Sequence, residues 1–179
     1  MPFLSRVSGG YQSDSSARKR EIIRRSSATP ASITMTLTST TFNNFDTMPI
    51  RTKHNLTGCN GSNTSPQLTW TVNTLGTIAT WRLRCIDIDA SNFIHWSVDN
   101  IPASSTTYSI PENVTWTSDV GIVINNTDWI AFGDPQGANG YGGPCPFGTH
   151  RYQFTVTGHD SLGNAVTGAT ATITGLASN

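Results

Sequence analysis

The sequence predicts an all-β fold of the sandwich type, preceded by an extended N-terminal arm. Short stretches of alternating apolar and polar residues recur along most of the 179-residue chain. Glycine, proline and asparagine stand between these stretches, as expected for turns that connect antiparallel strands. The body of the chain shows no convincing helical period. Repeated short strands separated by turn residues therefore favour two packed sheets over a helical or mixed fold.

Composition divides the chain in two, and we place the boundary after residue 30. Residues 1–30 carry six basic and two acidic side chains and few large apolar ones, which is typical of a segment that cannot build a core. A short helix over residues 15–25 is conceivable there. Residues 31–179 are predicted to form the sandwich domain. The basic arm is expected to meet a protein partner or an assembly, a phosphate surface, or its own body.

The strands of the body follow from the alternation, taken in chain order. In residues 79–88, for example, Trp81, Leu83 and Cys85 fall on one face, which predicts that this face is buried. Residues 55–65 are rich in glycine and asparagine and are predicted to form a loop. The predicted strands are residues 32–42, 68–72, 79–88, 94–98, 107–110, 121–124, 151–157 and 166–173.

Residues 140–154 carry the strongest functional signal, with the sequence Gly-Tyr-Gly-Gly-Pro-Cys-Pro-Phe-Gly-Thr-His-Arg-Tyr-Gln-Phe. The glycines are expected to take positive φ and to let the backbone approach a ligand, and the prolines to stiffen the loop. The alternation that follows places His150 and Tyr152 on one face of a strand. Arg151 falls on the other face, where we expect an ion pair or a carbonyl contact.

Two carboxylates and a further histidine are expected to join this segment. Asp87 and Asp89 end a predicted strand and, as an i, i+2 pair, are predicted to share a face. If the loop over residues 140–149 folds over the hairpin that leads from Asp89 to His95, then Asp87, His95, His150 and Tyr152 converge on one cavity, where imidazole, phenol and glycine amide donors suit an anion. A carboxylate would orient the ring of His95, and nearby carboxylates would raise the histidine pKa, so that anion binding strengthens below neutral pH if His95 or His150 takes up a proton.

Three motifs in order along the chain point to a known family. They are Ser65-Pro66-Gln67-Leu68-Thr69-Trp70, Asp87-Ile88-Asp89-Ala90 with His95-Trp96, and the segment 140–152. Together they resemble the phosphatidylethanolamine-binding protein family, also called Raf kinase inhibitor-like proteins, and most of all its bacterial branch. The resemblance runs from about residue 33 to residue 160. It implies a central β-sandwich with a few short helices at its edge.

The resemblance also implies a pocket for phosphate-like and carboxylate-like anions, including phospholipid head groups. Three departures bear on this pocket. The stretch Asp87-Ile88-Asp89-Ala90-Ser91 lacks the two prolines of the usual Asp-Pro-Asp-Ala-Pro, Phe147 stands where a second proline is common, and residues 125–139 look expanded. Carried over residue by residue, the implied ligand-binding set is Asp87, His95, Gly143, Pro144, His150 and Tyr152, with Asp89, Trp96 and Tyr141 beside it.

The sequence leaves three roles open. The first is a non-catalytic binding protein for a small anionic ligand. The alternative is a structural subunit of a larger assembly such as a virion, attached through residues 1–30, and the third is a kinase or protease inhibitor-like regulator. No Gly-x-Ser-x-Gly stretch predicts a catalytic serine, and we expect neither an enzyme nor a cofactor.

Other features of the sequence bear on metal binding, nucleic-acid binding, location and disulfide formation. The spacing of the histidines does not predict a metal site, and the few basic residues of the body argue against nucleic-acid binding except by the arm. No apolar run is long enough to span a bilayer and no signal sequence is seen, which favours a cytoplasmic or assembly-associated location. Cys59 and Cys145 both lie in predicted loops, and whether they form a bridge is left open.

Overall fold

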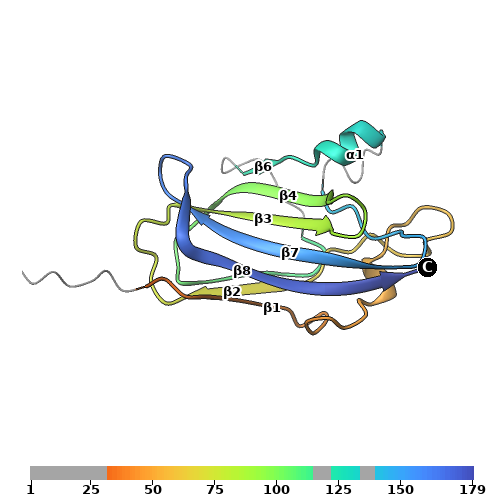
Figure 1. The fold of residues 1–179 in the computed structure, drawn as a ribbon, viewed down its shortest axis with the longest axis horizontal. Helices are drawn as coiled ribbons and strands as arrows, with labels where there is room; N and C mark the ends of the chain where they lie inside the picture. Colours follow the sequence, from red (N-terminus) through yellow and green to blue (C-terminus); the bar gives the residue numbers. More distant parts are fainter. Residues whose placement is uncertain (1–31, 115–121, 134–139) are drawn as a thin grey trace, which may run out of the picture. The chain divides into compact units, whose positions relative to one another are not determined.

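Two antiparallel sheets make up most of the computed structural model, which describes residues 32–114, 122–133 and 140–179 (Figure 1). The small sheet has the order β1-β2-β5, from β1 (Met35–Thr38), β2 (Leu68–Val72) and β5 (Thr107–Ile110). The large sheet has the order β6-β4-β3-β7-β8, from β6 (Val123–Ile124), β4 (Phe93–Pro102), β3 (Thr80–Asp87), β7 (Thr149–His159) and β8 (Ala165–Ser178). The predicted all-β sandwich is confirmed. The predicted arm, its helix over residues 15–25 and the boundary after residue 30 lie outside the described residues.

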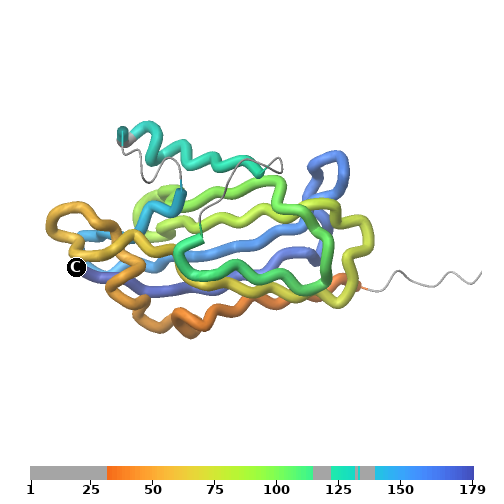
Figure 2. The backbone as a smooth tube through the Cα atoms, turned by 180° about the vertical axis from the view of Figure 1, so that it is seen from behind, coloured from red at the N-terminus to blue at the C-terminus, as the bar shows by residue number. Residues whose placement is uncertain are grey.

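The core lies between the two sheets, whose strands run alongside each other in the view from behind (Figure 2). Trp81, Leu83 and Cys85 of β3 are fully buried, as the alternation predicts. Trp70 of β2 meets Trp81 edge to face, with ring centroids 6.2 Å apart. Such contacts stabilise the packing of the two sheets, because each aromatic ring buries a large apolar area between them.

The strand limits show what alternation alone can locate. β2 and β5 match the predicted ranges residue for residue. β4, β7 and β8 are longer than predicted, whereas β1 is shorter. β4 passes through Asn100, which has a φ of 62°, and continues to Pro102 instead of stopping before it. A residue with a left-handed φ inside a strand interrupts the regular pairing and forms a β-bulge. The alternation of apolar and polar residues in the sequence does not reveal such a bulge.

Two short helices stand at the edges: the 3₁₀ turn η1 (Ile50–Thr52) and α1 (Thr127–Phe132). α1 is too short to show a helical period, and it was not predicted from the residues. Side chains at its start bind it to β4, because Asp128 accepts a hydrogen bond from Ile94 N at 2.6 Å and Asn126 accepts one from Ser97 N at 2.5 Å. α1 is thereby held beside the end of the sheet where β4 begins.

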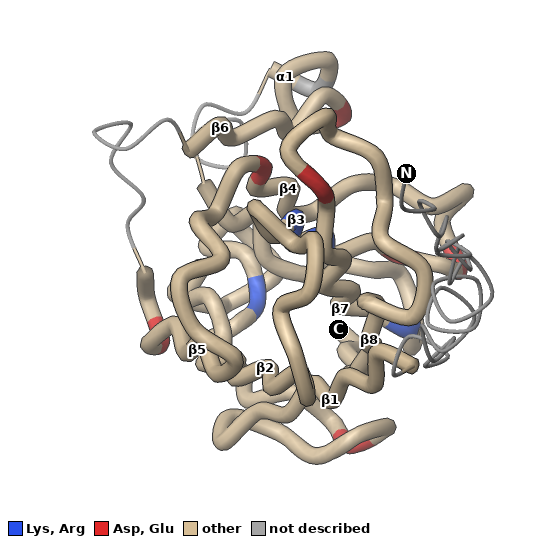
Figure 3. Tube along the Cα trace, turned by 90° about the vertical axis from the view of Figure 1, so that its left-hand side faces the viewer, with Lys and Arg blue, Asp and Glu red and all other residues tan. Residues whose placement is uncertain are grey.

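Charged residues are few and scattered along the described chain (Figure 3). Three arginines pair with carboxylates: Arg51 with Glu112, Arg82 with Asp99, and Arg151 with Asp89. Within the described ranges no helix is long and apolar enough to cross a membrane.

Candidate functional site

The ends of three neighbouring strands bring the predicted site residues together. Asp87 is the last residue of β3, His95 lies near the start of β4, and His150 and Tyr152 lie near the start of β7. The register pairs Asp87 with Tyr152 on one side and with Phe93 on the other. Because the strands are antiparallel, the end of β3 and the beginnings of β4 and β7 meet at one end of the sheet. The predicted convergence of these four side chains is therefore seen in the structure.

A buried carboxylate paired with a partly exposed histidine forms the centre of the site. His150 Nδ1 donates to Asp87 Oδ2 at 2.7 Å. The side chain of Asp87 is only 4% exposed, whereas that of His150 is 24% exposed. The hydrogen bond fixes the tautomer and the orientation of the ring, so Nε2 is the ring nitrogen left for a ligand.

Tyr152 lies against this pair and against His95. Its ring meets that of His95 edge to face, with centroids 5.0 Å apart. Burial, and then the charge of Asp87 and a hydrogen bond to it, raise the pKa of Tyr152 well above its ordinary value. The phenol therefore keeps its proton at neutral pH and acts as a neutral donor.

His95 does not have the partner that the sequence suggested. Its Nδ1 donates to the Gly142 carbonyl oxygen at 2.7 Å, and Asp87 instead binds His150. The side chain is almost fully buried, and this burial lowers the pKa of His95 to about 4 despite the nearby Asp87. The expectation of a raised pKa at His95 was wrong, because desolvation disfavours the imidazolium more than the carboxylate favours it.

The glycine segment is also built differently from the prediction. Gly142 N donates to His95 O at 2.9 Å and Gly143 N donates to Asn63 Oδ1 at 2.6 Å, so neither amide is left for an anion. Neither glycine has positive φ, unlike Gly148 with a φ of 93°. A Cβ at Gly143 would lie 2.6 Å from His54 N. Close packing is the reason for glycine at position 143, and the expectation that its amide serves as a donor to an anion was wrong.

Three residues that sequence reasoning missed close the site. His54, which is 1% exposed, stacks on Trp129 of α1 with centroids 5.0 Å apart, and Trp129 meets His95 edge to face. Asn63 spans the glycine segment, since it donates to Tyr141 O at 2.7 Å and accepts from Gly143 N. They come from a turn-rich loop and from a six-residue helix, and neither segment carries a periodic signal in the sequence.

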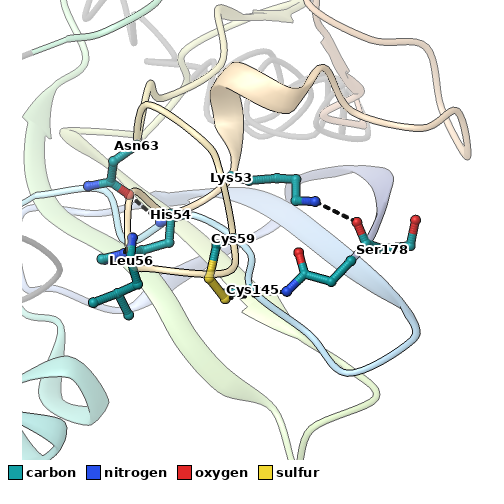
Figure 4. The surroundings of a disulfide bond; sticks show 9 residues. Lys53, His54, Leu56, Cys59, Asn63, Cys145 and Ser178 are labelled. Carbon is teal, nitrogen blue, oxygen red and sulfur yellow. Dashed lines mark hydrogen bonds between the residues drawn. A yellow bond between two sulfur atoms is a disulfide. The ribbon is translucent and has the colours of Figure 1, made fainter.

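A disulfide between Cys59 and Cys145 ties the loop of His54 and Asn63 to the Gly-Pro segment (Figure 4). The two Cα atoms are 5.3 Å apart, and 86 positions separate the cysteines in the sequence. Pro144, beside Cys145, is buried and accepts a hydrogen bond from His54 N at 3.0 Å. The sequence left open whether Cys59 and Cys145 pair, and the structure shows that they form a disulfide at the rim of the site.

The remaining predicted residues lie beside the site rather than in it. Asp89 follows the end of β3 and binds Arg151, whose side-chain hydrogen bond lowers the pKa of Asp89 to about 2. Asp89 therefore does not share a face with Asp87, whereas the ion pair expected at Arg151 is confirmed. Trp96 and Tyr141 are buried, and their rings meet at 5.4 Å in the core.

Two further points concern access and metals. Phe147 is fully exposed, so it does not plug the site. Within residues 32–114, 122–133 and 140–179, no group of three or more histidine, cysteine, aspartate or glutamate side chains is arranged to hold a metal ion.

Relatives in sequence support one family. Residues 38–176 match the family described as phosphatidylethanolamine-binding protein. The UPF0098 protein YbcL of Escherichia coli K12 is 36% identical over 110 residues, which cover 55% of this chain and 54% of YbcL. This chain thus aligns with about half the length of that relative. The UPF0098 protein YbhB of the same organism is 34% identical over 130 residues, which cover 68% of this chain and 76% of YbhB.

Solved structures agree with the sequence relatives. The crystal structure of E. coli YbcL, described as a new member of the mammalian PEBP family, superposes with a TM-score of 0.64 at 26% identity and covers 81% of this chain and 98% of YbcL. CT736 of Chlamydia trachomatis, described as a PEBP homologue, shares the fold with a TM-score of 0.61 at 23% identity and covers 82% of this chain and 98% of CT736. The chain belongs to the phosphatidylethanolamine-binding protein family and is similar to its bacterial members.

Proposed function

We propose that this chain is a non-catalytic binding protein that takes a small anionic group, such as a phosphate or a phospholipid head group, at His150. Membership in the family supports a binding role. The observation that carries the anion proposal is the pair of buried Asp87 and partly exposed His150, joined at 2.7 Å. The pair places one titratable nitrogen at the opening of an otherwise buried polar cluster.

The pair of Asp87 and His150 explains how the protein would compensate the negative charge of a bound anion. Asp87 already accepts the Nδ1 proton, so Nε2 carries a proton only when the ring is an imidazolium. The Nε2–H group would then donate to an oxyanion of the ligand in a charge-assisted hydrogen bond. Anion binding and proton uptake at His150 are therefore linked.

The surroundings limit which part of a ligand enters. The amides of Gly142 and Gly143 are already bonded within the protein, and Tyr152 is 1% exposed. His150 is the most exposed of the titratable residues in the set, so it would make the first contact with an anion. A single phosphate or carboxylate group fits this description, with the rest of the ligand outside the site.

Calorimetric titration with sulfate and with phosphoethanolamine tests the proposal. Sulfate keeps its charge between about pH 5 and pH 8, so any change in its affinity over that range reports on the protein. We expect the affinity for sulfate to rise toward pH 5. His150→Gln should lower it at least about tenfold, equivalent to about 1.4 kcal/mol.

His159→Gln is the matched control, because His159 lies at the other end of β7 and its Nδ1 donates to Gly163 O. Its affinity for sulfate should equal that of the unmodified chain. Asp87→Asn is a second test, since a neutral amide cannot compensate the imidazolium. Equal affinity in all four proteins, or an affinity that does not change with pH, would contradict the proposal.

A further inference from the structure

A hollow of about 300 Å³ lies on the outer face of the large sheet, away from the core. The alternation of β3 explains its position: Trp81, Leu83 and Cys85 point inward, so the intervening residues point outward. Neighbouring strands complete the lining, because the register sets Arg84 beside Thr155. The lining groups two arginines, two isoleucines and two threonines, namely Arg82, Arg84, Ile86, Ile94, Thr155 and Thr157.

Arg84 stands out among the arginines of the described ranges. The other three, Arg51, Arg82 and Arg151, each bind a carboxylate. Arg84 has no ion pair and no side-chain hydrogen bond within the described residues, and its Nε is buried away from water. A buried donor without a partner is unfavourable, because it has lost its water and gained nothing in exchange. A ligand that binds Arg84 would remove that cost.

The other groups of the hollow define the ligand. A guanidinium presents a planar fork that matches the two oxygens of a carboxylate or a phosphate. The hydroxyl of Thr155 and the amide of Asn92 offer further donors, while Ile86 and Ile94 supply an apolar wall. A volume of about 300 Å³ is at the lower end of the range for small-molecule sites.

We propose that this outer hollow binds a small organic anion, in which a carboxylate or phosphate ester pairs with Arg84 and a compact apolar body covers Ile86 and Ile94. The site is separate from the one at His150. Asp87 points to the inner cluster, whereas Ile86, the residue before it, lines the outer hollow. The two proposals therefore stand or fall independently.

The test is a ¹⁵N–¹H NMR titration with three probes of similar size: benzoate, phenyl phosphate and the neutral benzamide. The probes are added to about 10 mM, a range that detects millimolar dissociation constants. We expect saturable shifts at the Arg84 Nε–Hε signal and at the amides of Ile86, Ile94 and Thr155. Benzoate and phenyl phosphate separate the two anion chemistries, and saturation by either one supports the proposal.

Variants assign the binding to Arg84. Arg84→Gln should weaken binding of the anionic probe at least about tenfold. Arg84→Lys keeps the charge without the planar fork and should weaken it less. Arg51→Gln is the matched control, since Arg51 binds Glu112 and does not line the hollow, and His150→Ala should leave binding here intact. Near-ultraviolet circular dichroism checks that each variant is folded.

Three results would overturn the proposal: no saturable shift with either anion in the unmodified chain, equal binding by Arg84→Gln, or equal binding of benzamide. Equal binding of benzamide would mean that the hollow binds apolar rings whether or not they carry a charged group.

Discussion

The two faces of the large sheet handle buried charge in different ways. On the inner face Asp87 binds His150, His95 and Gly142 bond to each other, and Gly143 N donates to Asn63. On the outer face Arg84 has no partner within the described ranges, although its Nε is out of contact with water. A satisfied cluster needs no ligand to complete its hydrogen bonds. An unsatisfied donor instead favours the binding of a ligand that supplies the missing hydrogen-bond acceptor.

The disulfide should be the strongest support of the inner site, and removing it gives the largest effect. We expect Cys59→Ser with Cys145→Ser to lower the free energy of unfolding by about 2–4 kcal/mol, because the bridge closes a loop of 86 positions. Urea unfolding measures this change. The unmodified chain in the presence of a reductant should match the double variant.

The same variant sharpens the comparison between the faces. Affinity for sulfate at His150 should fall once the rim is loosened, while binding of benzoate in the outer hollow should be unchanged. A parallel loss at both places would show that the faces are coupled through the sheet.

His95 should make stability depend on pH. Because burial lowers its pKa from 6.5 to about 4, the unfolded chain takes up a proton in this window that the folded chain does not. The stability contributed by neutral His95 is therefore full above about pH 6.5 and is lost as the pH falls toward about 4, by about 3 kcal/mol in all. Urea unfolding across this range measures the loss.

His95→Asn is the control for this prediction. Its amide nitrogen can replace Nδ1 as the donor to Gly142 O, but it does not titrate. The pH dependence between about 6.5 and about 4 should become shallower in this variant. An unchanged slope would assign the dependence to other groups.

Gly143 separates close packing from backbone freedom. Gly143→Ala should cost about 1–3 kcal/mol, because its Cβ would lie 2.6 Å from His54 N and force the rim apart. Gly148→Ala is the matched change in the same segment. It has no atom within 4 Å but a φ of 93°, so it should show backbone strain of about 1–2 kcal/mol without loss of sulfate binding. Equal sulfate affinity in both variants would contradict this role of Gly143.

The smallest effect is expected at the exposed pair of Arg151 and Asp89. Arg151→Gln removes the guanidinium hydrogen bonds to Asp89 but keeps the one from the backbone N–H of residue 151, so the pKa of Asp89 should move only part of the way from about 2 back toward 3.8. A carboxyl-detected NMR titration measures the shift. The thermal midpoint at neutral pH should hardly change, because exposed ion pairs contribute little to stability. A large drop in the midpoint would show that the pair supports the inner site.

Alternation and motif order were enough to predict the sandwich, the family and the meeting of Asp87 with His150 and Tyr152. Period-two patterns identify β2 and β5 because one face of each strand is buried and the other is rich in threonine and serine. The exchange of partners between the two histidines could not be foreseen. Both follow turns at the same end of the sheet, and only packing decides which ring reaches the carboxylate.

The glycine segment was misread for a physical reason. Positive φ and close approach both require glycine, so the sequence does not tell them apart. At Gly143 the requirement comes from the backbone of Thr52, Lys53 and His54, and His54 lies 89 positions away in the sequence. His54 and Asn63 lie in a loop without periodic pattern, and α1 is only six residues long. Contacts made by such segments depend on three-dimensional packing that a local pattern does not encode.

The crosslink at the rim also changes what a break in the backbone would do. The chain from Cys59 to Cys145 forms a covalent ring that contains β2 to β6, while β1, β7 and β8 lie outside it. A protease that cuts once within this ring leaves a single covalent molecule, which electrophoresis separates into two pieces only after reduction. The strands before the cut and the strands after it therefore remain covalently linked, one copy of each, even when the polypeptide between them is severed.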